Sequence, residues 1–202
     1  EAGRLGFQNS PGVSVKIYNR SLQILVNESY EHFVAEPLIK PADLGLARMN
    51  AKKEVFVSHI LVGHRDSYLG RPPERTLDEA LILSQQIKND FNEGEGFAVL
   101  AEKHSDDPGA KENRGEVGWI KWGSTVPEFQ VMAFSLDRGS LSPPVLTDFG
   151  YHLILVSESR PSDYQYMDDD AYEGLIINIT KNSIRGSLQS AAIEYDKKMI
   201  DL

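Results

Sequence analysis

The chain has 202 residues, 41% of them apolar and 25% charged, which is typical of a folded globular protein of one domain or two small ones. Its 21 basic and 30 acidic side chains give a formal net charge of −9. This charge argues against binding to duplex nucleic acid or to an anionic membrane surface, because both need concentrated positive charge. The absence of cysteine excludes disulfides, thiolate catalysis and cysteine-ligated zinc. No apolar run reaches the ~20 residues of a membrane-spanning helix.

Residues 1–53 are predicted to form an N-terminal helical segment. From about Val13 to Phe33, apolar residues recur at steps of three and four, which is typical of a helix with one apolar face. Pro37 and Pro41 are expected to end this helix. The pattern then changes abruptly to strand-type residues, so we place a domain boundary near residue 53.

The middle segment, residues 54–160, alternates strand and helix patterns. Thr76 and Glu79 form a capping box at the start of one helix, and Pro127 suits the first turn of another. Two turn-rich loops, over 63–75 and 105–115, separate the elements. In chain order the patterns predict a buried strand, two helices, a short strand, a third helix and two final strands, at residues 55–62, 76–94, 97–104, 116–120, 127–135, 144–147 and 151–157.

The last segment, residues 161–202, is predicted to be one long helix. Asp168, Asp169 and Asp170 are favourable at its N-terminus, and apolar residues keep helical spacing from Tyr172 to the chain end. An apolar stripe of this length needs a partner surface. We therefore expect it to pack against the N-terminal segment, so that both chain ends form a helical lobe around the inserted middle segment.

Five groups of short motifs follow one another between residues 55 and 158. They are SHILV at 58–62, FAVLAEKHSDDP at 97–108, RGEVGW at 114–119, VPEF at 126–129 with AF at 133–134, and TDFGYH at 147–152. In this order and spacing the segment resembles the parvulin-type peptidyl-prolyl cis-trans isomerases, or rotamases. The resemblance implies an α+β fold, a four-stranded antiparallel sheet surrounded by helices. The flanking terminal helices make the layout similar to that of SurA- and PrsA-type extracytoplasmic foldases.

Parvulins rotate the peptide bond that precedes proline, whose partial double-bond character gives a barrier of roughly 18–20 kcal/mol. Rotation forms no covalent bond to the enzyme, so it requires an apolar proline pocket and a small polar cluster, without a metal or other cofactor. The resemblance implies that the polar cluster consists of His59, Asp107, Thr147 and His152, with Thr147 fixing the histidine tautomers. A histidine on a strand, taken alone, is more simply read as a hydrogen-bonded core residue.

The two neighbouring acids of the SDDP motif are expected to differ. We expect burial beside apolar groups to raise the pKa of Asp107, so that a protonated carboxyl approaches the substrate carbonyl. Asp106 is expected to be a solvated turn residue.

The resemblance also implies that Val117, Thr125, Phe129 and Phe149 line the proline pocket. The ring of Phe129 can stack on a pyrrolidine ring, although periodicity alone would read Phe129 as ordinary helix core. Methionine is usual in the family where this chain has Thr125, so the pocket is expected to be shallower or more polar.

Charged loops and the other histidines do not point to a second ligand. Three arginines in the 63–75 loop are spread out and accompanied by acids, which does not favour recognition of a phosphorylated residue before proline. His32, His64 and His104 lack metal-ligand spacing and are read as surface or helix-packing residues.

Two functions from different classes remain open at this point. The first is a peptidyl-prolyl isomerase that acts on unfolded or folding polypeptides containing Xaa-Pro. The second is a holdase, in which the helical lobe binds unfolded clients and the parvulin segment has little or no isomerase activity. A third option is that the terminal helices form a homodimer. The absence of cysteine and the foldase-like layout favour the periplasm or cell envelope, and the start at Glu1 suggests a processed or trimmed chain.

Overall fold

The computed structural model describes residues 10–200, except for the side chains of Glu31 and of residues 187–200. The first nine residues of the predicted N-terminal segment therefore lie outside the described residues, as do the side chains at the end of the last apolar stripe. The chain divides into two compact units, Glu1–Lys40 and Pro41–Leu202.

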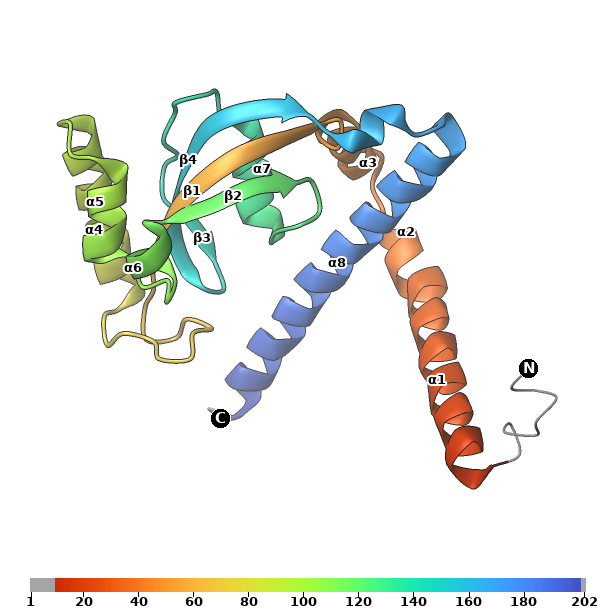
Figure 1. Ribbon diagram of the computed structural model, residues 1–202. Helices are drawn as coiled ribbons and strands as arrows, with labels where there is room; N and C mark the ends of the chain where they lie inside the picture. The colour runs from red at the N-terminus through yellow and green to blue at the C-terminus, as the bar shows by residue number, and fades with distance from the viewer. Residues whose placement is uncertain (1–9, 201–202) are drawn as a thin grey trace. The chain divides into compact units, whose positions relative to one another are not determined.

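The first unit is helical, as predicted. It contains α1 (Pro11–Tyr30), a π-helical segment η2 (Glu31–Ala35) and the short helix α2 (Glu36–Leu38), drawn in red to orange in Figure 1. The helical run ends at Leu38, one residue after Pro37, and Pro41 begins the next helix, so the two prolines mark the end of the run as expected. None of the residues of α1 is buried.

The second unit is built on a four-stranded antiparallel sheet with the order β2-β1-β4-β3 (Figure 1). Its strands are β1 (Lys53–Val62), β2 (Glu116–Lys121), β3 (Val145–Thr147) and β4 (Gly150–Pro161). Every strand predicted from the sequence is present. The α+β fold with a parvulin-like sheet is therefore confirmed, and β1 and β4 are its central strands.

Helices cover both faces of this sheet because side chains alternate between the faces along each strand. On one face, α4 (Leu77–Asn92) and α5 (Phe97–His104) pack on Ile60 and Leu153. On the other face, α7 (Pro127–Ser135) packs on Val57 and Ile154. Residues of β1 and β4 that alternate with Ile60 and Leu153 therefore point toward α7.

Local signals position the elements that lead to and from the central strands. The capping box at the start of α4 is confirmed, since Thr76 Oγ1 accepts from Glu79 N and Glu79 Oε2 accepts from Thr76 N. A short helix, α6 (Ala110–Asn113), lies in the 105–115 segment that was predicted to be loop. At the corner between β3 and β4, Gly150 has a φ of 125°, and a Cβ there would lie 2.5 Å from the carbonyl oxygen of Val62. Only glycine suits this corner.

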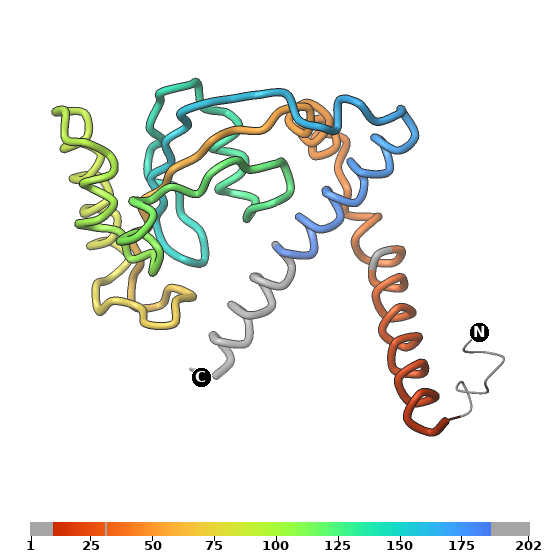
Figure 2. Tube along the Cα trace, viewed as in Figure 1, coloured from red at the N-terminus to blue at the C-terminus, as the bar shows by residue number. Residues whose placement is uncertain are grey.

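The C-terminal helix α8 (Asp169–Ile200) follows a 3-10 turn, η3 (Asp163–Tyr166), and contacts α3 (Pro41–Asn50) within the second unit (Figure 2). Arg48 Nη2 and Glu173 Oε2 form an ion pair at 2.7 Å, and the Tyr172 hydroxyl donates to the Arg48 carbonyl at 2.6 Å. Ile176 is fully buried in the apolar cluster that includes α7. The start of α8 thus packs on a short helix just before β1, while packing against α1 stays a prediction.

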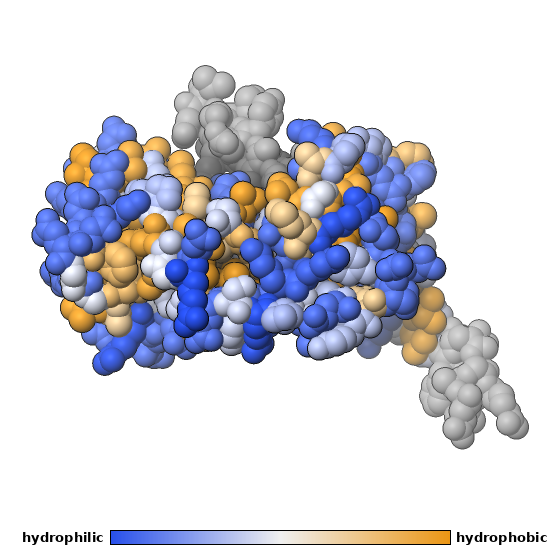
Figure 3. Space-filling model, turned by 90° about the horizontal axis from the view of Figure 1, so that it is seen from above, coloured by the Kyte–Doolittle hydropathy of each residue, from blue (hydrophilic) through white to orange (hydrophobic). Residues whose placement is uncertain are grey.

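The surface of the molecule is largely hydrophilic on the face drawn in Figure 3, with smaller apolar areas between the charged residues. Among residues 10–200, no helix combines the length and apolar composition needed to cross a lipid bilayer.

Candidate active site

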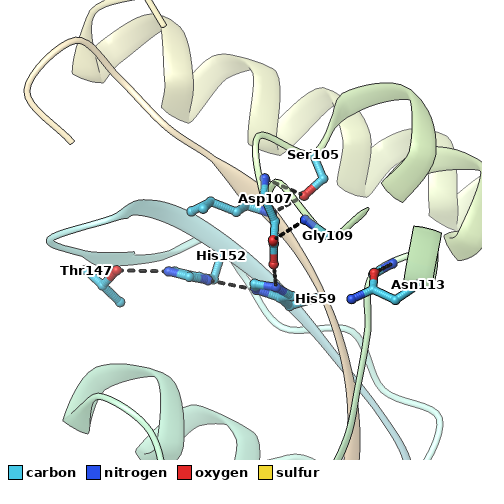
Figure 4. Close-up of polar contacts among 9 residues, drawn as sticks. His59, Ser105, Asp107, Gly109, Asn113, Thr147 and His152 are labelled. Atoms are coloured by element: carbon cyan, nitrogen blue, oxygen red, sulfur yellow. Dashed lines mark hydrogen bonds and ion pairs between the residues drawn. The ribbon is translucent and has the colours of Figure 1, made fainter. Parts of the chain in front are cut away.

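Two histidines meet on the sheet face that α7 covers. His59 lies on β1 and His152 on β4, and their Nδ1 atoms are 3.1 Å apart (Figure 4). The rings are stacked, with centroids 5.4 Å apart and an interplanar angle of 16°. His59 is partly buried, and His152 is only 5% exposed. The central strands therefore hold the two imidazoles in a fixed pair.

Asp107 reaches this pair from the segment between α5 and α6. Its Oδ2 lies 2.7 Å from His59 Nε2, and its Oδ1 accepts a hydrogen bond from Gly109 N at 2.9 Å. Both oxygens of the carboxylate are thus oriented by donors, and one donor is the imidazole.

Thr147 completes the cluster at the opposite end. Its Oγ1 lies 2.9 Å from His152 Nε2 and accepts from Phe149 N at 3.1 Å. Figure 4 shows Thr147, His152 and His59 in a row, with Asp107 above His59. The four polar residues named from the sequence therefore lie in one hydrogen-bonded chain.

The pKa of Asp107 is lowered, so the expectation of a protonated carboxyl is wrong. The hydrogen bond with His59 is the main cause, and the Gly109 N–H also lowers the pKa. Partial burial acts in the opposite direction and is outweighed. Asp107 is therefore an anion at neutral pH, and it accepts a hydrogen bond from His59 Nε2–H.

The pKa of His152 is lowered from 6.5 to about 3, chiefly by burial and also by the neighbouring His59. His152 is therefore neutral at pH 7 and carries one N–H. At one end of the hydrogen-bonded chain Phe149 N–H donates to Thr147 Oγ1, and at the other end His59 Nε2–H donates to the Asp107 carboxylate.

The ring of Phe129, on α7, is an apolar neighbour of this hydrogen-bonded chain of side chains. Its ring is 5% exposed and meets His59 and His152 edge to face, at centroid distances of 5.8 and 5.3 Å. The reading of Phe129 as helix core is confirmed, since it belongs to the core of the second unit, and its role in the proline pocket stays a prediction.

The other three residues expected in the proline pocket are less closely connected to the cluster. Phe149 is partly buried, adjoins Thr147 through its backbone N–H, and meets Tyr68 edge to face at 6.1 Å. Thr125 is partly buried, and its hydroxyl has no hydrogen-bond partner among the described residues. Val117 is 44% exposed, and the β1–β2 register passes over it between Gly118 and Glu116. Their pocket role stays a prediction.

The sequence reading missed the residues that hold Asp107 in place. Ser105 Oγ accepts hydrogen bonds from Leu61 N at 3.1 Å and from Asp107 N at 3.3 Å. Asp106 was expected to be a solvated turn residue, and this is wrong because its carboxylate accepts from Gly63 N and pairs with Arg75. The SDDPG run could have signalled such a turn, but it could not have identified Arg75 as the partner.

An open hollow of about 410 Å³ lies beside the segment that carries Asp107. Its lining residues come from the 63–75 loop and from both neighbours of Asp107, namely Leu69, Gly70, Arg71, Asp106 and Pro108. Within the described part of the chain, no group of three or more histidine or acidic residues is arranged to hold a metal ion.

The chain is similar to known chaperones and foldases. It is 35% identical over 141 residues to the chaperone SurA of Chromohalobacter salexigens, covering 64% of this chain and 31% of that protein. It is 40% identical over 111 residues to the foldase protein PrsA 3 of Bacillus cereus, covering 55% and 34%. These matches thus cover about a third of the length of either relative.

A solved structure and a family model agree with the fold. The crystal structure of the peptidylprolyl isomerase PrsA from Bacillus anthracis has a TM-score of 0.59 at 20% identity, covering 95% of this chain and 86% of that one. At this identity the likeness concerns the fold alone. The family model of the PPIC-type PPIase domain matches residues 45–160, which is more than half of the chain. The chain therefore belongs to the PPIC-type peptidyl-prolyl cis-trans isomerase family, the parvulin-type enzymes.

Proposed function

We propose that the His59–Asp107–Thr147–His152 cluster and the adjoining Phe129 isomerise Xaa-Pro bonds in unfolded or folding polypeptides, and so assist their folding. The observation that carries the proposal is the continuous hydrogen-bonded chain from Thr147 to Asp107, with the Phe129 ring against both imidazoles. A rigid polar chain beside an aromatic ring suits a substrate that combines a carbonyl group with an apolar pyrrolidine ring.

The mechanism we propose is differential binding of the twisted amide. In the planar ground state, resonance makes the carbonyl oxygen more negative than in the twisted state. An ionised Asp107 near that oxygen raises the free energy of the planar form more than that of the twisted form. This difference lowers the barrier without any covalent step, and each tenfold gain in rate needs about 1.4 kcal/mol. The apolar side of the site excludes water and strengthens the electrostatic effect.

The histidines then act by orientation. His59 holds the Asp107 carboxylate through a 2.7 Å hydrogen bond, and His152 with Thr147 fixes the ring of His59. Neither imidazole needs to transfer a proton. We assign the pyrrolidine of the substrate to the side of Phe129, with Val117, Thr125 and Phe149 as further lining residues.

An isomerisation assay on the full chain tests this proposal. Magnetisation-exchange NMR on an Ala-Xaa-Pro-Phe peptide measures the cis–trans rate at equilibrium. We expect the full chain to accelerate exchange and the double variant Asp107→Ala, His152→Ala to lose the acceleration by at least tenfold. A double variant that isomerises as fast as the parent would show that the site is assigned incorrectly.

The residue before proline is the next element of specificity. The hollow at Leu69, Arg71 and Pro108 adjoins the Asp107 segment, so we propose that it receives the side chain next to the proline. A peptide series with alanine, leucine, glutamate and phosphoserine before proline measures this preference. Equal kcat/KM values across the series would show that the hollow does not bind the side chain before proline.

A second candidate function, that of a holdase, rests on the first unit. The helix α1 exposes a series of large apolar side chains, at Val15, Ile17, Tyr18, Leu22, Ile24, Leu25 and Val26. Exposed apolar surface of this kind suits an unfolded client or the α1 helix of a second copy. Suppression of client aggregation by the Asp107→Ala, His152→Ala variant tests the holdase separately from the enzyme. Light scattering that gives the mass of a monomer would exclude the homodimer at the concentration used.

We also propose a location in the periplasm or cell envelope. The lack of cysteine and the similarity to the chaperone SurA and the foldase PrsA support it. Fractionation of cells that produce the protein from its full gene tests the location, and recovery in the cytosol would contradict it.

A further inference from the structure

The segment that carries Asp107 is attached to the rest of the second unit by an ion pair next to the site. The Asp106 carboxylate pairs with the guanidinium of Arg75, the residue just before Thr76, the N-cap of α4. The same carboxylate oxygen accepts from Gly63 N at 2.8 Å, and Arg75 donates to the Gly63 carbonyl at 3.2 Å. The two side chains are only 23% and 27% exposed, so solvent screens this pair less than an ion pair on the surface.

Backbone contacts continue this attachment to the end of β1. Asp106 N donates to the Leu61 carbonyl at 2.7 Å, and Leu61 N donates to Ser105 Oγ at 3.1 Å. Leu61 lies two residues after His59 on the same strand. The backbone that leads into Asp107 is therefore hydrogen-bonded to β1, the strand that carries His59, the hydrogen-bond partner of Asp107.

The Arg75 end of this attachment also closes the 63–75 loop. Arg65 N donates to the Arg75 carbonyl at 2.9 Å, so the two ends of the loop meet. Farther along the loop, Tyr68 N donates to the Asp148 carbonyl at 2.8 Å, beside Phe149. One loop thus contacts both the Asp107 side and the Phe149 side of the site.

From these contacts we infer that Arg75 and Asp106 are positioning residues for the isomerase reaction, which hold Asp107 within hydrogen-bonding distance of His59. Neither residue bonds to His59, His152 or Thr147, so they act through the backbone that carries Asp107. The inference rests on the proposed function, because it assigns a catalytic role to Asp107. Without the ion pair, the Asp106 carboxylate accepts a hydrogen bond only from Gly63 N. The segment that carries Asp107 is then no longer bound to the start of α4.

The kinetic test compares Arg75→Gln with the parent chain in full length. Small displacements of a catalytic group cost large factors in rate, so we expect kcat to fall about tenfold. KM for a peptide with alanine before proline should stay within about twofold, because the contacts of Phe129 are unchanged and the short alanine side chain makes little use of the hollow that Asp106 helps to line. Arg75→Lys keeps the positive charge and should recover part of the loss. Arg114→Gln is the matched control, since it removes an exposed pair with Glu102 near the same segment.

A spectroscopic measurement reads the position of Asp107 directly. The ¹⁵N chemical shift of His59 Nε2 reports its hydrogen bond to Asp107, and His59→Gln identifies the signal. We expect Arg75→Gln to change this shift and Arg114→Gln to leave it at the parent value. If Arg75→Gln folds incompletely, Asp106→Asn breaks the ion pair while its amide oxygen still accepts from Gly63 N, and the same change of shift is expected.

The outcomes separate this inference from the proposed function. If Arg75→Gln, or Asp106→Asn in its place, keeps both kcat and the His59 shift of the parent, the positioning role is refuted while the isomerase proposal stands. If the parent chain does not isomerise peptides, the proposed function fails, and the role assigned to this pair in catalysis fails with it. The His59 shift then reports only whether the pair holds Asp107 in place.

Discussion

The buried His152 predicts a specific loss of stability in mild acid. Its folded-state pKa of about 3 is far below the ordinary value of 6.5, because the ring is buried and lies against His59. The unfolded chain therefore binds a proton at this residue as the pH falls below 6.5, whereas the folded chain does not. The stability from His152 is complete above pH 6.5 and is lost as the pH falls toward 3.

The size of the effect follows from proton linkage. At pH 5, protonation stabilises the unfolded chain at this single residue by about 2 kcal/mol relative to pH 7.5. The figure is almost the same for any folded-state pKa below about 4, because the folded ring then stays neutral at pH 5. Asp107 does not contribute in this range, since its pKa is lowered from 3.8. His104, whose pKa is also lowered, adds to the pH dependence of the unfolding free energy, equally in the parent and in a variant that lacks His152.

Urea unfolding between pH 7.5 and 5 measures this loss. Trp122, which is 6% exposed in the core of the second unit, supplies the fluorescence signal. Between pH 7.5 and 5 we expect the parent to lose about 2 kcal/mol more unfolding free energy than His152→Gln, which has no imidazole to protonate. His32→Gln makes the same substitution at a side chain that is 70% exposed and controls for the replacement of histidine by glutamine as such. Equal pH dependence in parent and His152→Gln would show that burial does not lower the pKa of His152.

Substitutions at four other residues test the fold and the site. Phe129→Leu should lower kcat/KM for an Ala-Xaa-Pro-Phe peptide by about tenfold, because the aromatic ring beside the imidazoles is lost, while unfolding free energy changes by less than about 1.5 kcal/mol. Gly150→Ala should lower the unfolding free energy by at least about 2 kcal/mol, since its φ of 125° and the Val62 carbonyl leave no room for a Cβ. Gly174→Ala in α8, with open space around it, should instead stabilise by up to about 1 kcal/mol in the same urea assay. Thr76→Ala should cost about 1 kcal/mol and Thr76→Ser much less, because serine keeps the capping oxygen; equal losses in the two variants would contradict the capping role.

The fold of the second unit could be predicted largely from local sequence signals. The capping box at Thr76 and Glu79 fixes the start of α4, and Gly94, with a φ of 106°, follows its end. The helix predicted over 97–104 has the bounds of α5. These elements depend on residues within a few positions of one another, so one sequence is sufficient to find them. The four residues of α6 escaped prediction because a single turn leaves no periodic pattern.

The chemistry of the site depends on contacts that the sequence does not contain. The motifs identify Asp107 and His59, which are separated by 48 positions, but the pKa of Asp107 depends on the 2.7 Å contact between them. Burial alone predicts a raised pKa, and the hydrogen bond reverses the direction. The pairs Arg75–Asp106 and Arg48–Glu173 join residues 31 and 125 positions apart, so no local pattern indicates them.

In the proposed reaction, a prolyl bond isomerises between Phe129 and the Asp107–His59 pair. Transferred NOEs between an exchanging Ala-Xaa-Pro-Phe peptide and the full chain test it most directly, because they report which side chains lie within ~5 Å of the proline while catalysis proceeds. We expect NOEs from the proline ring protons to the Phe129 ring in the parent chain, and accelerated exchange that is about tenfold weaker in Phe129→Leu. Accelerated exchange with proline NOEs to another part of the chain, and none to Phe129, would contradict it.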